Sequence, residues 1–184
     1  MISPTPAPAT SRRFGAFAMV LGIMVLAGCT PSPAPTPTPT AAFASEEDAF
    51  AAAEETYRAY TDALNSVVPA DPSTFERTYA FSSGGVQKAD RENFSTMHAE
   101  GYEIFGDAVV TKFSELDTKN SLKVVLAVIC VDVSDVSVRD ASGSSVVSPN
   151  RPDVYEVEAT FRWDGTSLRV DEVQRVEGDT CVGL

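Results

Sequence analysis

The sequence predicts an α+β domain over residues 46–184, with helices first and an antiparallel sheet after them. Apolar residues recur every three or four positions up to Gly101, which is typical of helices, and mostly alternate with polar ones beyond it, as in strands. The dipeptide Asp164-Gly165 is a strong signal for a two-residue hairpin loop. The composition, 43% hydrophobic and 22% charged, is globular and excludes wholesale disorder.

Three helices are expected at the start of this domain. Ser45 stands before three acidic residues, as in a capping box, and the first helix ends before Pro69 because a residue that precedes proline avoids the helical region. Its apolar face consists of Phe50, Ala53, Tyr57, Tyr60 and Leu64. After it we expect a short helix over 73–80, a loop over 82–85 and a third helix over 87–100 that Gly101 ends.

The strands are expected at 103–113, 122–134, 137–147, 154–163 and 168–176. The first is interrupted at Gly106-Asp107. The near-continuous apolar run of 122–134 predicts a central strand that is buried on both faces. Residues 137–147 turn back at 140–143, and in 154–163 the odd-numbered residues form one apolar face.

The order of these elements resembles the nuclear transport factor 2-like cone fold. The run Val128–Ser134, the segment 138–147, the Trp163-Asp164-Gly165 hairpin and Cys181 are also similar to small actinobacterial lipoproteins of unknown function. Those proteins have a Cys-x-Asp-x-Ser strand and a Cys near the C-terminus. The resemblance implies N-terminal helices packed on a curved antiparallel sheet and a place in the cell envelope, and it gives Asp132 a structural hydrogen-bonding role.

The segment 1–28 predicts an export signal. Arg12 and Arg13 precede the uncharged run 14–26, which is too short for a membrane-spanning helix. The residues Leu26-Ala27-Gly28-Cys29 resemble the lipobox of bacterial lipoproteins, which implies a lipidated Cys29 and a protein anchored at the outer face of the cell membrane. The alternative is a general secretory signal that contains a Cys by chance. Export by the general secretory route and export by the twin-arginine route both stay open.

Residues 29–45 predict a tether. Eight of the twelve prolines lie before position 40, and the segment 30–45 holds five of them with no charged residue. Because proline fixes φ and lacks a donor, this segment favours extended polyproline II and could hold a domain about 50 Å from its anchor. Its Thr-Pro alternation is also typical of sites that accept sugars.

The chain has three cysteines, an odd number for an exported protein. If Cys29 carries lipid, Cys130 and Cys181 remain as an even pair in an oxidising compartment, and we expect a disulfide between them. The alternative is two free thiols. No Cys-x-x-Cys motif is present, which argues against a redox enzyme.

The sequence contains no recognisable catalytic constellation. His98 is the one histidine, and a place in the last turn of a helix explains it without catalysis. There is no nucleophile elbow, phosphate-binding loop, dinucleotide fingerprint or zinc ligand set, so no cofactor is expected. Asp132 and Asp135 lack the further ligands of a calcium loop, so no metal site is expected.

Two classes of function are compatible with these features. We expect a non-enzymatic module that binds an envelope protein or a small apolar ligand; the alternative is a small isomerase, cyclase or hydrolase-like enzyme with an acid-base group in the cone. The expected pocket is lined by Tyr57, Tyr60, Tyr79, His98, Phe161 and Trp163, although such spacings, like that of Phe94, are also typical of plain core. Residues 46–184 hold 12 basic and 26 acidic residues, and a net charge of −14 opposes nucleic-acid binding.

Overall fold

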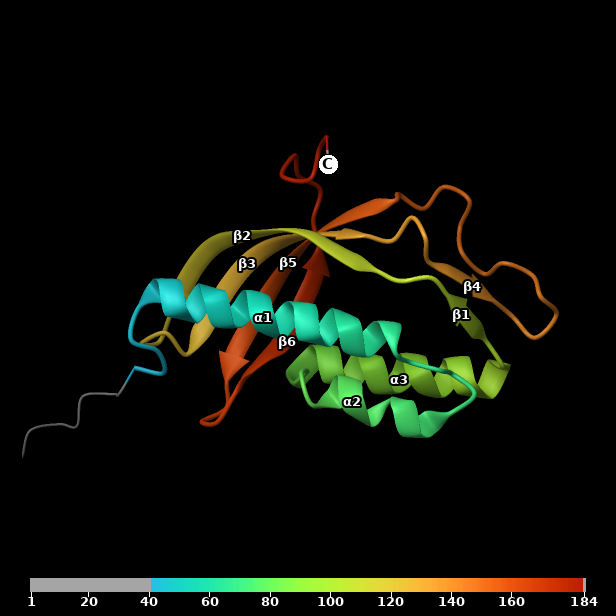
Figure 1. Ribbon diagram of the computed structural model, residues 1–184, viewed down its shortest axis with the longest axis horizontal. Coiled ribbons are helices and arrows are strands. Elements are labelled where there is room, and N and C mark those ends of the chain that lie inside the picture. Colours follow the sequence, from blue (N-terminus) through green and yellow to red (C-terminus); the bar gives the residue numbers. More distant parts are fainter. Residues whose placement is uncertain (1–40, 184) are drawn as a thin grey trace, which may run out of the picture. The chain divides into compact units, whose positions relative to one another are not determined.

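The computed structural model describes residues 41–183, in which three α-helices lie on one face of a curved four-stranded antiparallel sheet (Figure 1). The fold class is therefore α+β, as predicted. The predicted signal segment, Cys29 and the predicted tether up to residue 40 lie outside the described residues.

Helix α1 (Glu46–Asn65) begins where the capping signal predicts. The Ser45 hydroxyl accepts a hydrogen bond of 3.1 Å from the backbone N–H of Asp48, which satisfies one of the free donors of the first turn. The apolar face of α1 packs on the sheet through Phe50, Ala53 and Tyr57. The helix ends before Pro69, as expected.

The next two helices differ in their bounds from the prediction. The single helix expected over 73–80 is a 3-10 turn (Pro72–Thr74) followed by α2 (Glu76–Tyr79), because Asp71 accepts from the N–H of Ser73 and so begins the turn one residue earlier.

Helix α3 (Gly84–Glu100) begins within the predicted loop 82–85, because the Ser83 carbonyl already accepts a helical hydrogen bond from the Gln87 N–H. Gly101 ends it with a left-handed φ of 67°, as predicted.

The main sheet has the strand order β2-β3-β5-β6, with β2 (Val109–Lys119), β3 (Val124–Asp132), β5 (Val154–Trp163) and β6 (Leu168–Arg175). Strand β3 is central, as predicted, but it is not fully buried on both faces. Val125, Ala127 and Ile129 face the helices and are inaccessible to solvent, whereas Leu126 and Val128 on the opposite face are half-buried. The reason is that the helices cover one face of the sheet (Figure 1).

Two short strands form a separate sheet. Strand β1 (Glu103–Phe105) pairs with β4 (Ser137–Arg139), and the break at Gly106 separates β1 from β2 as expected. The hairpin between β5 and β6 is present, but its loop spans 164–167 and is longer than the two-residue loop expected. The Asp164 carboxylate explains the longer loop, since it accepts from the N–H groups of both Thr166 and Ser167.

The buried side chains form two clusters. The larger lies between α1 and the sheet and contains Tyr57, Tyr60 and Phe161 among its aromatic residues. The smaller joins α2 and α3 through Phe75, Tyr79 and Phe94. Beside these clusters, a hollow remains between α3 and the edge strand β6.

Candidate functional site

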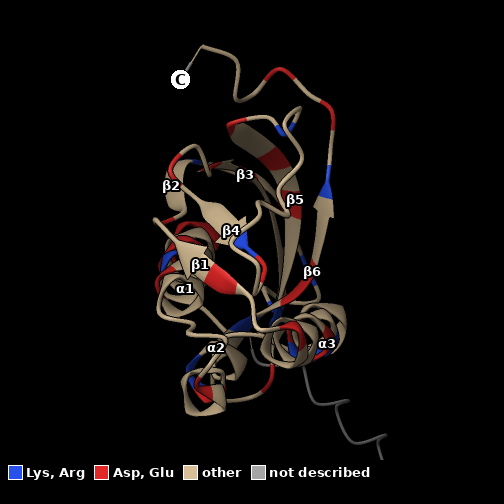
Figure 2. Ribbon diagram, turned by 90° about the vertical axis from the view of Figure 1, so that its right-hand side faces the viewer, with Lys and Arg blue, Asp and Glu red and all other residues tan. Residues whose placement is uncertain are grey.

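A hollow of about 520 Å³ opens between helices α1 and α3 and strands β5 and β6; we call it the α3–β6 pocket. It is bordered by Tyr60, Gly85, Val86, Ala89, Asp90, Glu158, Thr160, Glu172, Val173 and Gln174. Its volume lies within the range of small-molecule sites in proteins. Figure 2 shows α3 and β6 close together on this side of the domain.

The residue that distinguishes this pocket is Asp90 on α3. Val86, Asp90 and Phe94 follow one another at intervals of four, so all three lie on the buried face of the helix. Asp90 is only 7% exposed, and its Oδ1 accepts a hydrogen bond of 2.9 Å from the hydroxyl of Tyr60, which is itself buried. A carboxyl group is thus held between two helices at the side of an open hollow.

The other oxygen of this carboxyl group lacks a partner. Asp90 Oδ2 is fully buried and makes no hydrogen bond to any of the residues 41–183. The Ser82 hydroxyl lies 3.3 Å from the carbonyl of Thr78, to which it donates, and it is also close enough to the Asp90 carboxyl group to lower its pKa. A buried acceptor that is left unpaired costs about 1–3 kcal/mol, and it is therefore a feature that needs an explanation.

Burial also changes the acidity of this pair. It raises the pKa of Asp90 because the charged form loses its hydration, while the hydroxyls of Tyr60 and Ser82 act in the opposite direction. The pKa of Tyr60 is raised by burial and then by the negative charge of Asp90, and burial raises the pKa of Tyr57 to about 12. Both tyrosines are thus neutral phenols at physiological pH.

The six residues expected to line one pocket lie in five different places. Tyr60 borders the α3–β6 pocket. Tyr57 and Phe161 pack together in the main core, with ring centroids 6.2 Å apart. Trp163 borders a second hollow, of about 260 Å³, where its ring packs edge-on against Phe43.

The other two, Tyr79 and His98, border neither of these hollows. Tyr79 belongs to the smaller cluster, and Arg91 stacks over its ring at 3.9 Å from the centroid. His98 is exposed, and its Nδ1–H donates to the carbonyl of Pro69 at 2.8 Å, since a carbonyl oxygen can only accept. The ring therefore fixes the loop after α1 and does not border the α3–β6 pocket.

No acidic cluster with metal-binding geometry occurs in the described part of the chain. Asp132 accepts from the backbone N–H of Ser134 at 2.8 Å, which is the structural role expected for it. None of the helices between residues 41 and 183 combines the length and the apolar content needed to cross a membrane.

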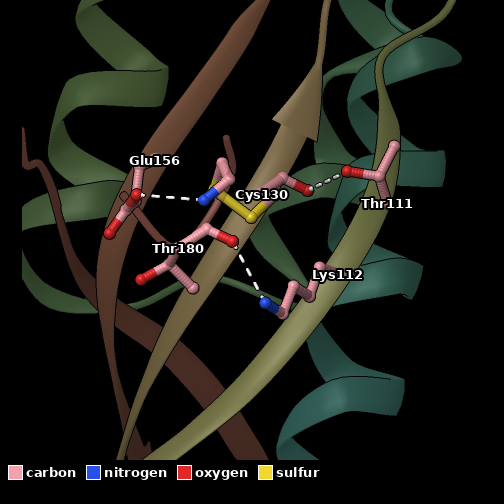
Figure 3. The surroundings of a disulfide bond; sticks show 6 residues. Thr111, Lys112, Cys130, Glu156 and Thr180 are labelled. Atoms are coloured by element: carbon pink, nitrogen blue, oxygen red, sulfur yellow. Dashed lines mark hydrogen bonds between the residues drawn. A yellow bond between two sulfur atoms is a disulfide. The ribbon is translucent and has the colours of Figure 1, made fainter. Parts of the chain in front are cut away.

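Cys130 and Cys181 form the predicted disulfide, with their Cα atoms 5.6 Å apart (Figure 3). The bond attaches the C-terminal tail to the face of the sheet that the helices leave open. The neighbours of Cys130 on β2 and β5 also hold this tail: Lys112 Nζ donates to the carbonyl of Thr180, and the Cys181 N–H donates to Glu156. Three adjacent strands thus fix the tail at one level of the sheet.

Sequence reasoning did not identify Asp90, although a signal was present. In the predicted third helix Asp90 shares a face with Phe94, and a charged residue on a buried helical face is uncommon unless it is paired. The pattern was obscured because α3 is polar for most of its length. Val173, which is 38% exposed and borders the pocket, was not singled out from the sequence either.

Comparisons with known proteins do not identify a family for this chain. No family model and no curated protein matches the chain. Among solved structures, it is similar to the intermembrane space region of the chloroplast protein ARC6, with a TM-score of 0.48, 12% identity and coverage of 70% of this chain and 97% of that one. It is also similar to a de novo designed β-sheet protein, with a TM-score of 0.33, 18% identity and coverage of 73% of this chain and 93% of the designed one. The nuclear transport factor 2-like cone stays a prediction.

Proposed function

We propose that this chain is a lipoprotein anchored through Cys29 at the outer face of the cell membrane, and that its folded domain binds a small ligand in the α3–β6 pocket. The anchor is supported by Leu26-Ala27-Gly28-Cys29 at the end of the apolar run 14–26. The disulfide between Cys130 and Cys181 agrees with export, because such bonds persist in oxidising compartments.

The anchor is tested by intact-mass analysis of the protein from its native host. The mature chain should begin at Cys29 and carry acyl chains, and it should fractionate with membranes because several chains give stable anchoring. The Cys29→Ala variant should lose both the added mass and the membrane association. An unmodified Cys29, or a soluble pool that Cys29→Ala leaves unchanged, would contradict the anchor.

The binding role rests on one observation, the open hollow of about 520 Å³ that borders the hydrogen-bonded pair Tyr60 and Asp90. A hollow of this volume, with apolar walls and a few polar groups, is typical of small-molecule sites. The apolar residues Val86, Ala89 and Val173 at the same pocket provide a surface for the ligand's hydrocarbon part.

This role is tested by thermal-shift screening of the mature chain, made soluble by Cys29→Ala, against a fragment library with cationic, neutral and anionic members. Fragments that bind the native state raise the melting temperature. Ala89→Trp should abolish the shift because it fills the pocket, whereas Ala99→Trp, on an exposed site of the same helix outside the pocket, should preserve it. A library without hits, or hits that survive Ala89→Trp, would contradict the binding role.

The same carboxyl group supports the alternative, a small enzyme with acid-base chemistry. The raised pKa of Asp90 is typical of a general acid or base, and the adjacent Tyr60 hydroxyl is a second proton-transfer group. Turnover of a substrate that Asp90→Asn abolishes without changing the fold would favour this alternative.

A further inference from the structure

We propose that the outer edge of strand β6 binds an extended, basic peptide segment of a partner protein, which joins the four-stranded sheet as a further strand. The inference goes beyond the proposed binding of a small ligand, because its occupant is a polypeptide and its site is the strand edge beside the α3–β6 pocket.

The first half of this edge already holds a strand of the chain itself. The carbonyl of Val170 accepts from the Ser83 N–H at 2.8 Å, and its N–H donates to the Phe81 carbonyl at 2.9 Å. The chain then turns into α3 at Gly84, and this cover ends. The next half of the strand, Glu172–Arg175, is exposed at all four residues. Figure 2 shows β6 at the outer edge of the sheet.

The strand register determines which backbone groups point away from the sheet. The Val176 N–H donates to the Glu156 carbonyl of β5 at 3.0 Å, and Gln174, two residues earlier, pairs with β5 in the same way. Because the bonding direction alternates along an antiparallel strand, the N–H and C=O groups of Val173 and Arg175 point outward. No hydrogen bond joins these four groups to another residue of the segment 41–183. Such a row of donors and acceptors is a template for a further strand.

The opposite edge of the sheet, strand β2, is less suited to pairing. Its register with β3 shifts twice, and the Arg58 side chain donates to the carbonyl of Val110 at 2.8 Å. Such irregularities and covered carbonyls hinder the addition of a strand. The segment Glu172–Arg175 pairs with β5 without a shift, so β6 presents the regular edge.

The two faces of β6 determine which side chains the peptide should carry. Val173 pairs with Ala159, faces the helices and borders the α3–β6 pocket, where it is 38% exposed. A peptide residue opposite Val173 would direct its side chain toward the pocket and should be apolar. Glu172 pairs with Thr160 on the other face of the sheet and is exposed, so the residue opposite it should be basic. The expected peptide alternates apolar and basic residues.

The charge of the domain favours such a peptide over a second copy of this chain. Residues 46–184 carry a net charge of −14, and a second copy would bring the same charge to the edge. Repulsion therefore opposes the pairing of two β6 strands, whereas a basic segment is attracted.

The test is a titration of the mature, disulfide-bonded chain with Cys29→Ala, followed by amide resonances and amide hydrogen exchange in NMR spectra. The probe is acetyl-KVKVK-amide, whose five residues match Glu172–Val176 in antiparallel register. Without the peptide, the amides of Val173 and Arg175 should exchange quickly and that of Val176 slowly. The peptide should shift the first two amides in a saturable way and slow their exchange.

Methylated peptides test the backbone pairing without a change in the protein. In the proposed register the valine N–H groups of the peptide donate to the carbonyls of Val173 and Arg175, and its lysine N–H groups point to solvent. N-methylation of both valines should weaken binding by about tenfold or more, because two hydrogen bonds are lost. N-methylation of the lysines is the matched control and should preserve binding. Equal losses for the two peptides would overturn the strand pairing.

Two further comparisons test the role of charge. The peptide acetyl-EVEVE-amide has the same alternation and should bind about tenfold more weakly. Glu172→Lys should weaken the binding of acetyl-KVKVK-amide by about fivefold, more than Glu115→Lys, which makes the same charge change at an exposed residue of β2. Equal effects of the two substitutions, or equal binding of the two peptides, would overturn the preference for a basic partner at this edge.

The remaining outcomes separate this inference from the proposed function. If the amides of Val173 and Arg175 exchange slowly without peptide, the edge is already occupied, and the inference is overturned. If acetyl-KVKVK-amide does not shift these amides while fragments still bind in a way that Ala89→Trp abolishes, the peptide site is refuted and the small-ligand pocket stands.

Discussion

Gly84 is the position at which one methyl group should destabilise the domain most measurably. Its φ is +49°, in the left-handed region, and a Cβ there would lie within the carboxylate of Asp171, 2.8 Å from its Cγ. Asp171 is buried and joins α3 to the sheet, since it accepts from the Ser83 hydroxyl at 2.9 Å and from Arg162 Nε at 3.0 Å. Gly84→Ala therefore perturbs both the backbone and this connection.

The two effects can be estimated separately. An alanine in the left-handed region costs about 1–2 kcal/mol. Displacement of the Asp171 carboxylate adds about 1–2 kcal/mol, because the bonded Arg162 side chain is 52% exposed and water replaces part of that interaction. We expect Gly84→Ala to lower the free energy of unfolding by about 2–4 kcal/mol, the sum of these two costs. Gly143→Ala, at φ +83° with no atom within 4 Å, should show only the backbone cost.

The assay is urea unfolding under non-reducing conditions, followed by the fluorescence of Trp163, the single tryptophan. With a slope of about 2 kcal/mol per molar urea, Gly84→Ala should lower the midpoint by about 1–2 M. In an Asp171→Ala background the penalty should fall toward that of Gly143→Ala, since the clash with the carboxylate is gone and only the Asp171 carbonyl oxygen, 3.2 Å from the Cβ position, stays close. An equal penalty for Gly84→Ala in both backgrounds would refute the role of Asp171.

Three further predictions concern the disulfide, the buried acid and the core. Replacement of Cys130 and Cys181 by alanine should lower the free energy of unfolding by about 4 kcal/mol, given their sequence separation of 51, and hydrogen exchange should accelerate first in the tail; unchanged protection there would contradict the tail's attachment. Asp90→Asn should stabilise the domain at pH 7–8. Burial raises the pKa of Asp90 in the folded state above its unfolded value of about 4. Between these two pKa values the native protein binds more protons than the unfolded chain, so the free energy of unfolding of the wild type falls as the pH rises from one to the other. Urea unfolding at several pH values should show that the difference in free energy of unfolding between Asp90→Asn and the wild type shrinks toward pH 4. A difference that does not depend on pH would argue against a buried ionisable group. Phe161→Ala should cost about 3–5 kcal/mol in the same assay because its ring is fully buried, whereas Leu116→Ala, at a residue 52% exposed, should change stability by less than about 0.5 kcal/mol; similar losses at both positions would contradict the assignment of the core.

The features that sequence predicted well are those fixed by neighbours in the chain. Ser45 caps α1, Gly101 ends α3, and the alternation of β5 places Val157, Ala159 and Phe161 toward the helices. Each of these features depends on interactions within a few residues of the chain or on the two-residue period of side chains along a strand. The same locality explains the error at α3, since Gly84 and Gly85 signal a loop although the hydrogen bond from the Gln87 N–H to the Ser83 carbonyl begins the helix there.

The site was not predictable in the same way because it depends on contacts distant in the chain. Tyr60 and Asp90 are 30 residues apart, and β6, which borders the pocket, lies much further along the sequence. Aromatic spacing identified apolar faces but could not separate Tyr57, which fills the core, from Tyr60, which reaches the pocket. The disulfide between Cys130 and Cys181 was predictable because only two cysteines remain if Cys29 is lipidated, and because an exported protein is expected in an oxidising compartment.

The attachment of the tail to β3 determines how the domain would bear a pulling force. Tension applied to the C-terminus passes from Cys181 through the covalent bond to Cys130 in the centre of the sheet, and so bypasses the segment between them. Strand β6 lies at an edge and would otherwise be peeled from β5 one hydrogen bond at a time. With the disulfide intact the force acts on β3, which is hydrogen-bonded to β2 on one side and to β5 on the other. Unfolding under force then requires the β2–β3 and β3–β5 pairings to shear together.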